Sequence, residues 1–185
     1  MKTLSSILWR RLDVAGHEYA ELRSQPHGWL LDGTALFEHE KQPTRLEYEV
    51  KCDETWTTLS ATVRGRVGTR DVDVRIVRHA DGSWDLNDQR CIVVSGCLDV
   101  DLNFSPSTNV LPIRRLNLSI GQKAQVRAAW LRFPSFALEP LEQSYHRLGE
   151  RLFRYESDGG KFVAELEVSE AGLAQRYGNL WTAAV

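Results

Sequence analysis

Residues 96–118 contain the densest group of side chains that could do chemistry. Alternating apolar and polar residues predict that this segment begins as a strand. Asp99 and Asp101 would then share one face, about 6.6–7 Å apart, because residues two apart on a strand point the same way. Two carboxylates at that spacing could divide acid–base work on a sugar. The same pair could instead bind an arginine or turn amides, which would make it structural.

Two adjacent arginines, Arg114 and Arg115, follow a turn over residues 105–110. Alternation at 116–120 predicts a strand, so we expect the arginines to point to opposite faces. We expect Arg114 to be structural and Arg115 to face a pocket, where a guanidinium can bind an anionic head group through two parallel hydrogen bonds. A salt bridge on each side is the structural alternative. Asn109 lies in the turn, where asparagine commonly bonds local backbone groups, and it could also contact a polar head.

Six tryptophans are many for a chain of 185 residues. Packing in the core explains most of them, since each is large and apolar with one hydrogen-bond donor. Trp56, Trp84 and Trp130 lie at or near predicted strands. These three could line an aromatic, apolar binding pocket.

Composition excludes several classes of function. A formal net charge of -2 and a pI near 6.2 predict no general attraction to nucleic acid. The five histidines show no metal-binding spacing, and no phosphate loop, dinucleotide fingerprint or serine-hydrolase elbow occurs, so we expect no metal and no cofactor. The odd set of Cys52, Cys91 and Cys97, without a signal peptide, predicts free thiols and a cytoplasmic location. No segment is long and apolar enough to span a membrane.

Period-two alternation dominates the rest of the chain, and each alternating segment is typical of a strand with one buried face. Turn signals such as Asp81-Gly82 and 158–160 separate these segments. Residues 141–155 fit either a helical stripe or strands, and we favour strands. The sequence predicts one all-β domain over residues 1–185, an antiparallel barrel or roll of about a dozen strands with little helix. The clearest alternating segments are 46–52, 59–63, 72–76, 116–120 and 162–168.

Three motifs stand out: Tyr48–Asp53 with Trp56-Thr57-Thr58, Gly96–Leu102 with its two aspartates, and Pro106–Leu116 with its arginine pair. These motifs resemble the putative glycolipid-binding family, bacterial proteins first described as a domain of unknown function. The resemblance continues through Trp130, Gln143 and Tyr145, and we add Tyr145 to the candidate ligand-binding residues. It implies a many-stranded antiparallel roll or half-barrel of two similar halves, comparable in shape to bacterial lipoprotein carriers that hold acyl chains.

Three functional hypotheses follow. The first is a non-enzymatic binder of an amphipathic small molecule, such as a glycolipid or lipid, held by apolar inward faces and polar groups of residues 99–115. The second is an enzyme, a hydrolase or isomerase on a sugar-like or lipid-like substrate, that uses Asp99 or Asp101 as acid or base. The third is a structural motif that locks two halves of the fold together. Fold alone does not decide among them.

Overall fold

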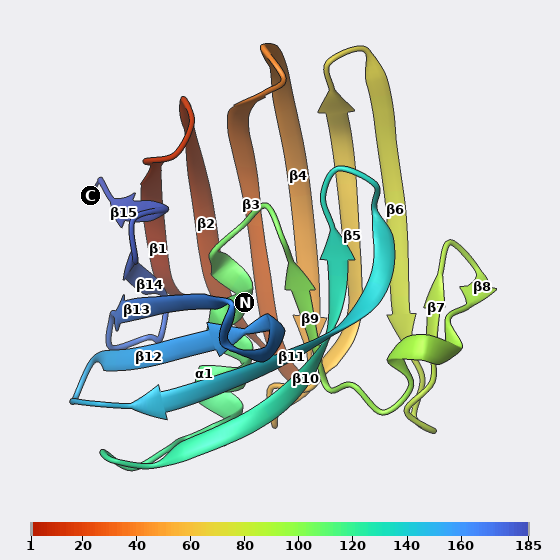
Figure 1. Ribbon diagram of the computed structural model, residues 1–185. Helices are drawn as coiled ribbons and strands as arrows, with labels where there is room; N and C mark the ends of the chain where they lie inside the picture. Colours follow the sequence, from red (N-terminus) through yellow and green to blue (C-terminus); the bar gives the residue numbers. More distant parts are fainter. Residues whose placement is uncertain (1, 185) are drawn as a thin grey trace.

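The computed structural model describes residues 2–184, which form one large sheet of fifteen strands that does not close (Figure 1). Its first half is a meander of long antiparallel strands that ends in a short hairpin. These strands are β1 (Lys2–Arg11), β2 (Gly16–Gln25), β3 (Gly28–His39), β4 (Gln42–Cys52), β5 (Thr58–Val67), β6 (Arg70–Arg78), β7 (Trp84–Leu86) and β8 (Gln89–Arg90).

The second half is a meander of mostly shorter strands. It pairs with the first half through β1 and the last strand, so the chain's two ends lie in the middle of the sheet. The edges are β8 and β9, and β9 pairs with its neighbour in parallel. The strands are β9 (Asp99–Leu102), β10 (Lys123–Arg132), β11 (Ala137–Arg147), β12 (Leu152–Ser157), β13 (Phe162–Val168), β14 (Ala174–Tyr177) and β15 (Trp181–Ala183).

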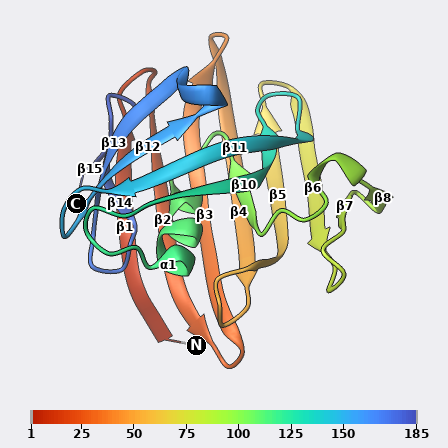
Figure 2. The same ribbon diagram turned by 60° about the horizontal axis from the view of Figure 1, so that its bottom comes forward.

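The sheet curls so that the two halves face each other. Strands β10 to β13 cross in front of the long strands β1 to β5, and helix α1 (Val110–Leu116) lies between the two layers (Figure 2). Short 3₁₀ turns occupy Ile92–Val94, Ser107–Asn109 and Asp158–Gly160. This arrangement is a half-barrel with one helical insert on its concave side.

Alternation in the sequence explains the two faces of most strands. In β4, Leu46, Tyr48 and Val50 are buried, while the residues between them are exposed or half-buried. One large core cluster draws on both halves of the sheet. A second cluster places Ile113 and Leu118 against Tyr145 and Phe153, which packs the helical segment against the second half.

The all-β prediction with little helix is confirmed, and the ambiguous segment 141–155 is mostly strand as expected, with a turn at residues 148–151. The strand predicted at 116–120 is wrong. Helix α1 continues to Leu116, and Asn117 ends it in a left-handed conformation with φ 42°. Burial of Val110, Leu111 and Ile113 stabilises helix here, and Pro112 is tolerated because it lies in the first turn.

Among residues 2–184, no helix is long and apolar enough to cross a membrane.

Candidate functional site

Asp99 and Arg115 form a buried ion pair between β9 and α1. The Nε of Arg115 donates to Oδ1 of Asp99 at 3.1 Å, and Nη2 donates to Oδ2. The side chains are 2% and 16% exposed, respectively. Burial raises the pKa of Asp99, while Arg115 and the charge of Arg78 oppose that shift. This carboxylate therefore serves a structural contact.

The ion pair reverses the expected roles of the two arginines. Both lie in the last turn of α1 instead of in a strand, so they point about 100° apart around a helix axis. Arg115 turns inward to Asp99, whereas Arg114 is exposed and lines a pocket. The prediction that Arg114 is structural and Arg115 faces the pocket is wrong for this reason.

Asp101 has a different environment, although it lies on the same strand. Its Oδ2 accepts a hydrogen bond of 2.6 Å from Nε2 of Gln143. Burial raises the pKa of Asp101 to about 6, and the negative charge of Asp99 adds to the shift. Asp101 also lines a cavity, so its carboxyl group is both poorly hydrated and within reach of a ligand.

We call this cavity, of about 550 Å³, the aromatic cavity. It lies on the inner side of β9 to β12 and reaches across to β1 and β15. Two arginines stack on its aromatic walls, Arg132 over Trp130 at 5.6 Å and Arg11 over Trp181 at 5.2 Å. Such stacking is favourable when a cation lies over a ring face. The lining includes Trp130, Tyr155, Phe162, Tyr177 and Trp181, with Asp101, Asn103, Ser105 and Asn109 as polar members.

Asn109 lines the same cavity and is held from two sides. Its Nδ2 donates to the carbonyl of Pro106 at 3.0 Å, and its Oδ1 accepts from the hydroxyl of Tyr145 at 2.8 Å. Tyr145 is 1% exposed and does not line the cavity itself. Trp84 is also fully buried and donates to the carbonyl of Cys97 at 3.2 Å. The fold thus uses Tyr145 and Trp84 as internal supports.

Glu18 is a functional candidate that our sequence reasoning missed. It is fully buried on β2, where Oε1 accepts 2.6 Å from the hydroxyl of Tyr48 and also accepts from Ser105. Burial raises the pKa of Glu18 to about 8, against the opposing hydrogen bonds. Ser105 connects this buried group to the wall of the aromatic cavity. The available signal was a glutamate in register with the inward residues Ala20 and Leu22.

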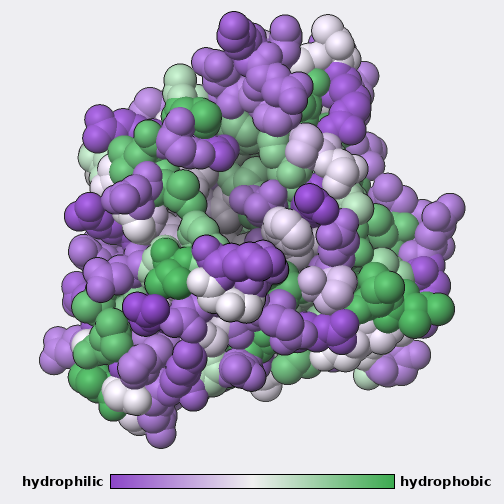
Figure 3. All heavy atoms as spheres, in the orientation of Figure 1, coloured by the Kyte–Doolittle hydropathy of each residue, from purple (hydrophilic) through white to green (hydrophobic). Residues whose placement is uncertain are grey.

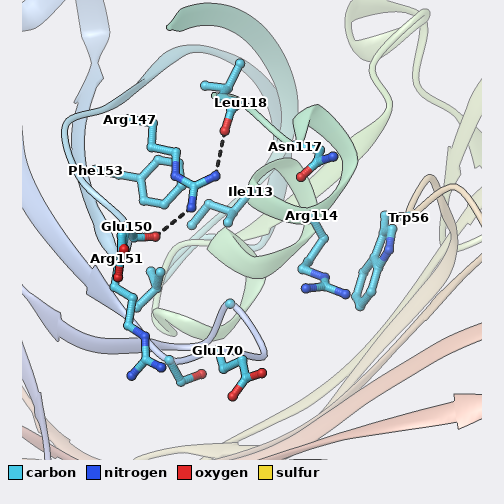
Figure 4. Close-up of a pocket in the computed structure, with 13 residues that line it drawn as sticks. Trp56, Ile113, Arg114, Asn117, Leu118, Arg147, Glu150, Arg151, Phe153 and Glu170 are labelled. Carbon is cyan, nitrogen blue, oxygen red and sulfur yellow. Dashed lines mark hydrogen bonds between the residues drawn. The ribbon is translucent and has the colours of Figure 1, made fainter. Parts of the chain in front are cut away.

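A second cavity, the arginine pocket, has a volume of about 430 Å³. It lies where α1 faces the β11–β12 and β13–β14 turns (Figure 4). Trp56 and Arg114 both line it, and the guanidinium carbon of Arg114 lies 5.2 Å from the ring centroid of Trp56. Its remaining lining includes Arg147, Glu150, Arg151 and Glu170 around Ile113, Leu118, Phe153 and Val168.

The predicted site residues therefore separate into three groups. Asp101, Asn109 and Trp130 meet at the aromatic cavity, and Trp56 and Arg114 meet at the arginine pocket. The remaining four, Asp99, Arg115, Trp84 and Tyr145, line neither cavity.

In the orientation of Figure 1 the surface is mostly hydrophilic and hollowed near its centre, where hydrophobic residues are visible inside a hydrophilic rim (Figure 3). Within residues 2–184, no cluster of histidine, cysteine or acidic side chains is arranged to hold a metal ion.

Comparison with solved structures finds the same fold elsewhere. A DUF1089 family protein from Pseudomonas aeruginosa is 30% identical, with a TM-score of 0.79 over 89% of this chain and 91% of that chain. A beta-barrel-like protein of domain of unknown function DUF1849 from Brucella abortus is 9% identical, with a TM-score of 0.56 over 97% and 94%, and shares the fold alone. No curated protein sequence matches. The family described as "Putative glycolipid-binding" matches residues 6–183, and this chain belongs to that family.

Proposed function

We propose that the protein binds an amphipathic small molecule of the glycolipid or lipid class, without catalysis, in the aromatic cavity. The observation that carries this proposal is the half-buried carboxylate of Asp101 set among aromatic rings in one cavity of about 550 Å³. That volume falls in the range of ordinary small-molecule sites. Three free thiols support the further proposal that the protein works in a reducing compartment such as the cytoplasm.

The cavity offers two kinds of contact to such a ligand. Aromatic faces, including Trp130 and Tyr177, can cover the apolar side of a sugar ring or the start of an acyl chain. Asp101 and Asn109 can accept hydrogen bonds from ligand hydroxyl groups. Gln143 and Tyr145 hold these two acceptors in place, so little ordering is needed when a ligand binds.

The enzymatic alternative would require two carboxyl groups to act on one substrate. The pair that the sequence suggested is not assembled in the cavity, because Asp99 is tied to Arg115 and does not line it. The raised pKa of Asp101 follows from burial, which a binding site produces as readily as a catalytic one. Binding is therefore the function that this geometry supports best.

A direct test uses n-octyl-β-D-glucoside as the probe, below its micellar concentration. Titration calorimetry should detect binding to the wild-type protein and much weaker binding of glucose alone. We expect Asp101→Asn and Trp130→Leu each to weaken binding about tenfold, the first by removing an ionised acceptor and the second by removing an aromatic face. Asp73→Asn is the matched control, because Asp73 is exposed on β6 and pairs with the exposed Arg64, far from the cavity lining.

Native mass spectrometry of protein purified without detergent provides the second measurement. A co-purified amphiphile of defined mass that is depleted in Trp130→Leu would support the proposal. The absence of glucoside binding, or equal affinity in Asp101→Asn, Trp130→Leu and wild type, would contradict it.

A further inference from the structure

Arg114 is an exposed, charged side chain whose position is not explained by packing in the core. Among residues 2–184 it forms no ion pair and no side-chain hydrogen bond, and its one specific contact is with the ring of Trp56. Its neighbour Arg115 satisfies the buried carboxylate of β9, so Arg114 is not needed there. A cation over an aromatic face needs no hydrogen bond, so the N–H donors of Arg114 remain available to a ligand.

Trp56 is itself held in a costly conformation beneath this arginine. Its φ is +70°, in the left-handed region that bulky residues rarely adopt. Oδ1 of Asp53 shapes the loop by accepting from the backbone of Thr55 at 2.8 Å and of Thr57 at 2.9 Å. The ring then lies flat on Trp29, with centroids 4.4 Å apart and planes 11° apart. Trp29, Trp56 and the guanidinium of Arg114, whose carbon lies over the Trp56 ring, thus follow one another in what we call the Trp29–Trp56–Arg114 stack.

The arginine pocket adds further positive charge to this stack. Arg147 donates hydrogen bonds to three backbone carbonyls, those of Gly149 at 3.1 Å and of Leu118 and Glu150 at 2.7 Å each, and forms part of the wall (Figure 4). Arg151 is exposed and, within the described chain, forms no ion pair or side-chain hydrogen bond. Figure 4 shows Arg114 and Arg151 on two sides of the pocket with Glu170 between them. Three arginines against Glu150 and Glu170 leave one net positive charge in the lining.

A neighbouring cavity extends the pocket on the other side of Arg114. It has a volume of about 490 Å³ and shares Trp56, Arg114, Ser169 and Glu170 with the arginine pocket. Ser5 and the apolar side chains of Leu4, Leu22 and Ala171 complete that cavity. Arg114 therefore stands at the junction between a charged pocket and a partly apolar one. An anionic group bound at Arg114 could carry an attached hydrocarbon chain into the second space.

We propose that the Trp29–Trp56–Arg114 stack, with Arg151, is an oxyanion site that binds a phosphate group. Planar guanidinium groups match the oxygens of phosphate with paired hydrogen bonds. The phosphate belongs either to the head group of an amphiphile or to a free phosphate. The arginine pocket shares no lining residue with the aromatic cavity, so this inference goes beyond the proposed function and does not depend on it.

The test compares three probes by titration calorimetry at low salt: n-octyl phosphate below its micellar concentration, inorganic phosphate, and n-octanol. We expect n-octyl phosphate to bind at least tenfold more tightly than n-octanol. If the phosphate belongs to a lipid head group, the affinity for n-octyl phosphate should be well above that for inorganic phosphate. Equal affinities would assign the site to free phosphate. Either result supports the oxyanion site.

Variants then locate the binding. Arg114→Gln should weaken phosphate binding at least tenfold and Arg151→Gln several-fold, while the matched control Arg64→Gln, an exposed arginine on β5, should leave it unchanged. Glu170→Gln should strengthen binding several-fold by removing a repelling charge, a gain that misfolding cannot produce. Unchanged affinity in Arg114→Gln, no effect of Glu170→Gln, or no binding of either phosphate would overturn the proposal.

The two cavities fail or succeed separately. Arg114→Gln should leave n-octyl-β-D-glucoside binding unchanged, and Asp101→Asn should leave n-octyl phosphate binding unchanged. Loss of binding of both probes in either variant would show that one cavity serves both, which would overturn the separate oxyanion site.

Discussion

Arg115 donates hydrogen bonds to both carboxylate oxygens of Asp99 and so connects helix α1 to the edge strand β9. Helix α1 follows β9 in the chain, and this contact brings the helix back against that strand. The turn between them carries Asn109. Because α1 is helical, the residue just before Arg115 points elsewhere and reaches Trp56. One short helix therefore separates a structural arginine from an accessible one.

Arg115→Ala should be far more destabilising than Arg114→Ala. The first leaves a buried carboxylate without its partner, which typically costs about 3–5 kcal/mol of unfolding free energy. The second removes an exposed side chain with one stacking contact and should cost about 1 kcal/mol or less. Urea denaturation of both variants at pH 7 measures the difference, and equal losses would show that Arg114 is structural too.

Glu18 should make the protein less stable as pH rises through neutrality. The pKa of Glu18 is about 8 in the folded chain and near its ordinary value of 4.5 when unfolded. The folded state keeps the proton longer, so unfolding releases it between these values and stability falls from about pH 4.5 to pH 8, by up to about 1.4 kcal/mol per pH unit. Below that window Glu18 is protonated in both the folded and the unfolded state, so its titration does not change the free energy of unfolding.

Glu18→Gln should remove most of this slope, since glutamine is similar in shape and does not titrate. Denaturation midpoints at pH 5, 6.5 and 8 should therefore diverge between wild type and Glu18→Gln, with the variant relatively more stable at pH 8. Glu47→Gln, at an exposed position of β4, is the matched control and should follow the wild type. Parallel curves for wild type and Glu18→Gln would contradict a buried, neutral Glu18.

Binding in the aromatic cavity should depend on pH through Asp101. The pKa of its carboxyl group is about 6, so it is mostly neutral at pH 5 and mostly ionised at pH 7. An ionised carboxylate accepts stronger hydrogen bonds from ligand hydroxyls, so affinity for n-octyl-β-D-glucoside should rise over this range. Calorimetry at pH 5, 6 and 7 tests this, and Asp101→Asn should show a flat profile. A wild-type affinity that falls with pH would count against Asp101 as a ligand-binding acceptor.

The three cysteines should react in order of exposure. Burial raises the pKa of Cys52 to about 12 and of Cys97 to about 11, and both side chains are nearly inaccessible. Cys91 is half-buried, and its pKa is raised less. A chromogenic disulfide reagent should modify one thiol first, and Cys91→Ser should abolish that phase because reaction requires an accessible thiolate. Unfolding without reductant should release three thiols, and a yield of one would reveal a disulfide.

Much of the fold could be predicted because a strand with one buried face has apolar residues at every second position of its sequence. In β4 and β13, apolar residues recur at every second position, which indicates strand and its buried face at once. The same rule failed at 116–120, where Leu116 and Leu118 alternate by accident of a helix end. There the long-range burial of α1 between the two layers outweighed the local pattern.

The candidate site divided differently. By itself the sequence determined the residue types and the acidic strand, because charged groups in an alternating segment are visible in one dimension. Only the tertiary structure decided that Asp99 meets Arg115, that Asp101 faces a cavity and that Trp56 lies beneath Arg114. Each of these contacts joins residues at least sixteen positions apart, or depends on the pitch of one short helix. Such pairings depend on how the sheet curls and where α1 lies within it, which no local pattern records.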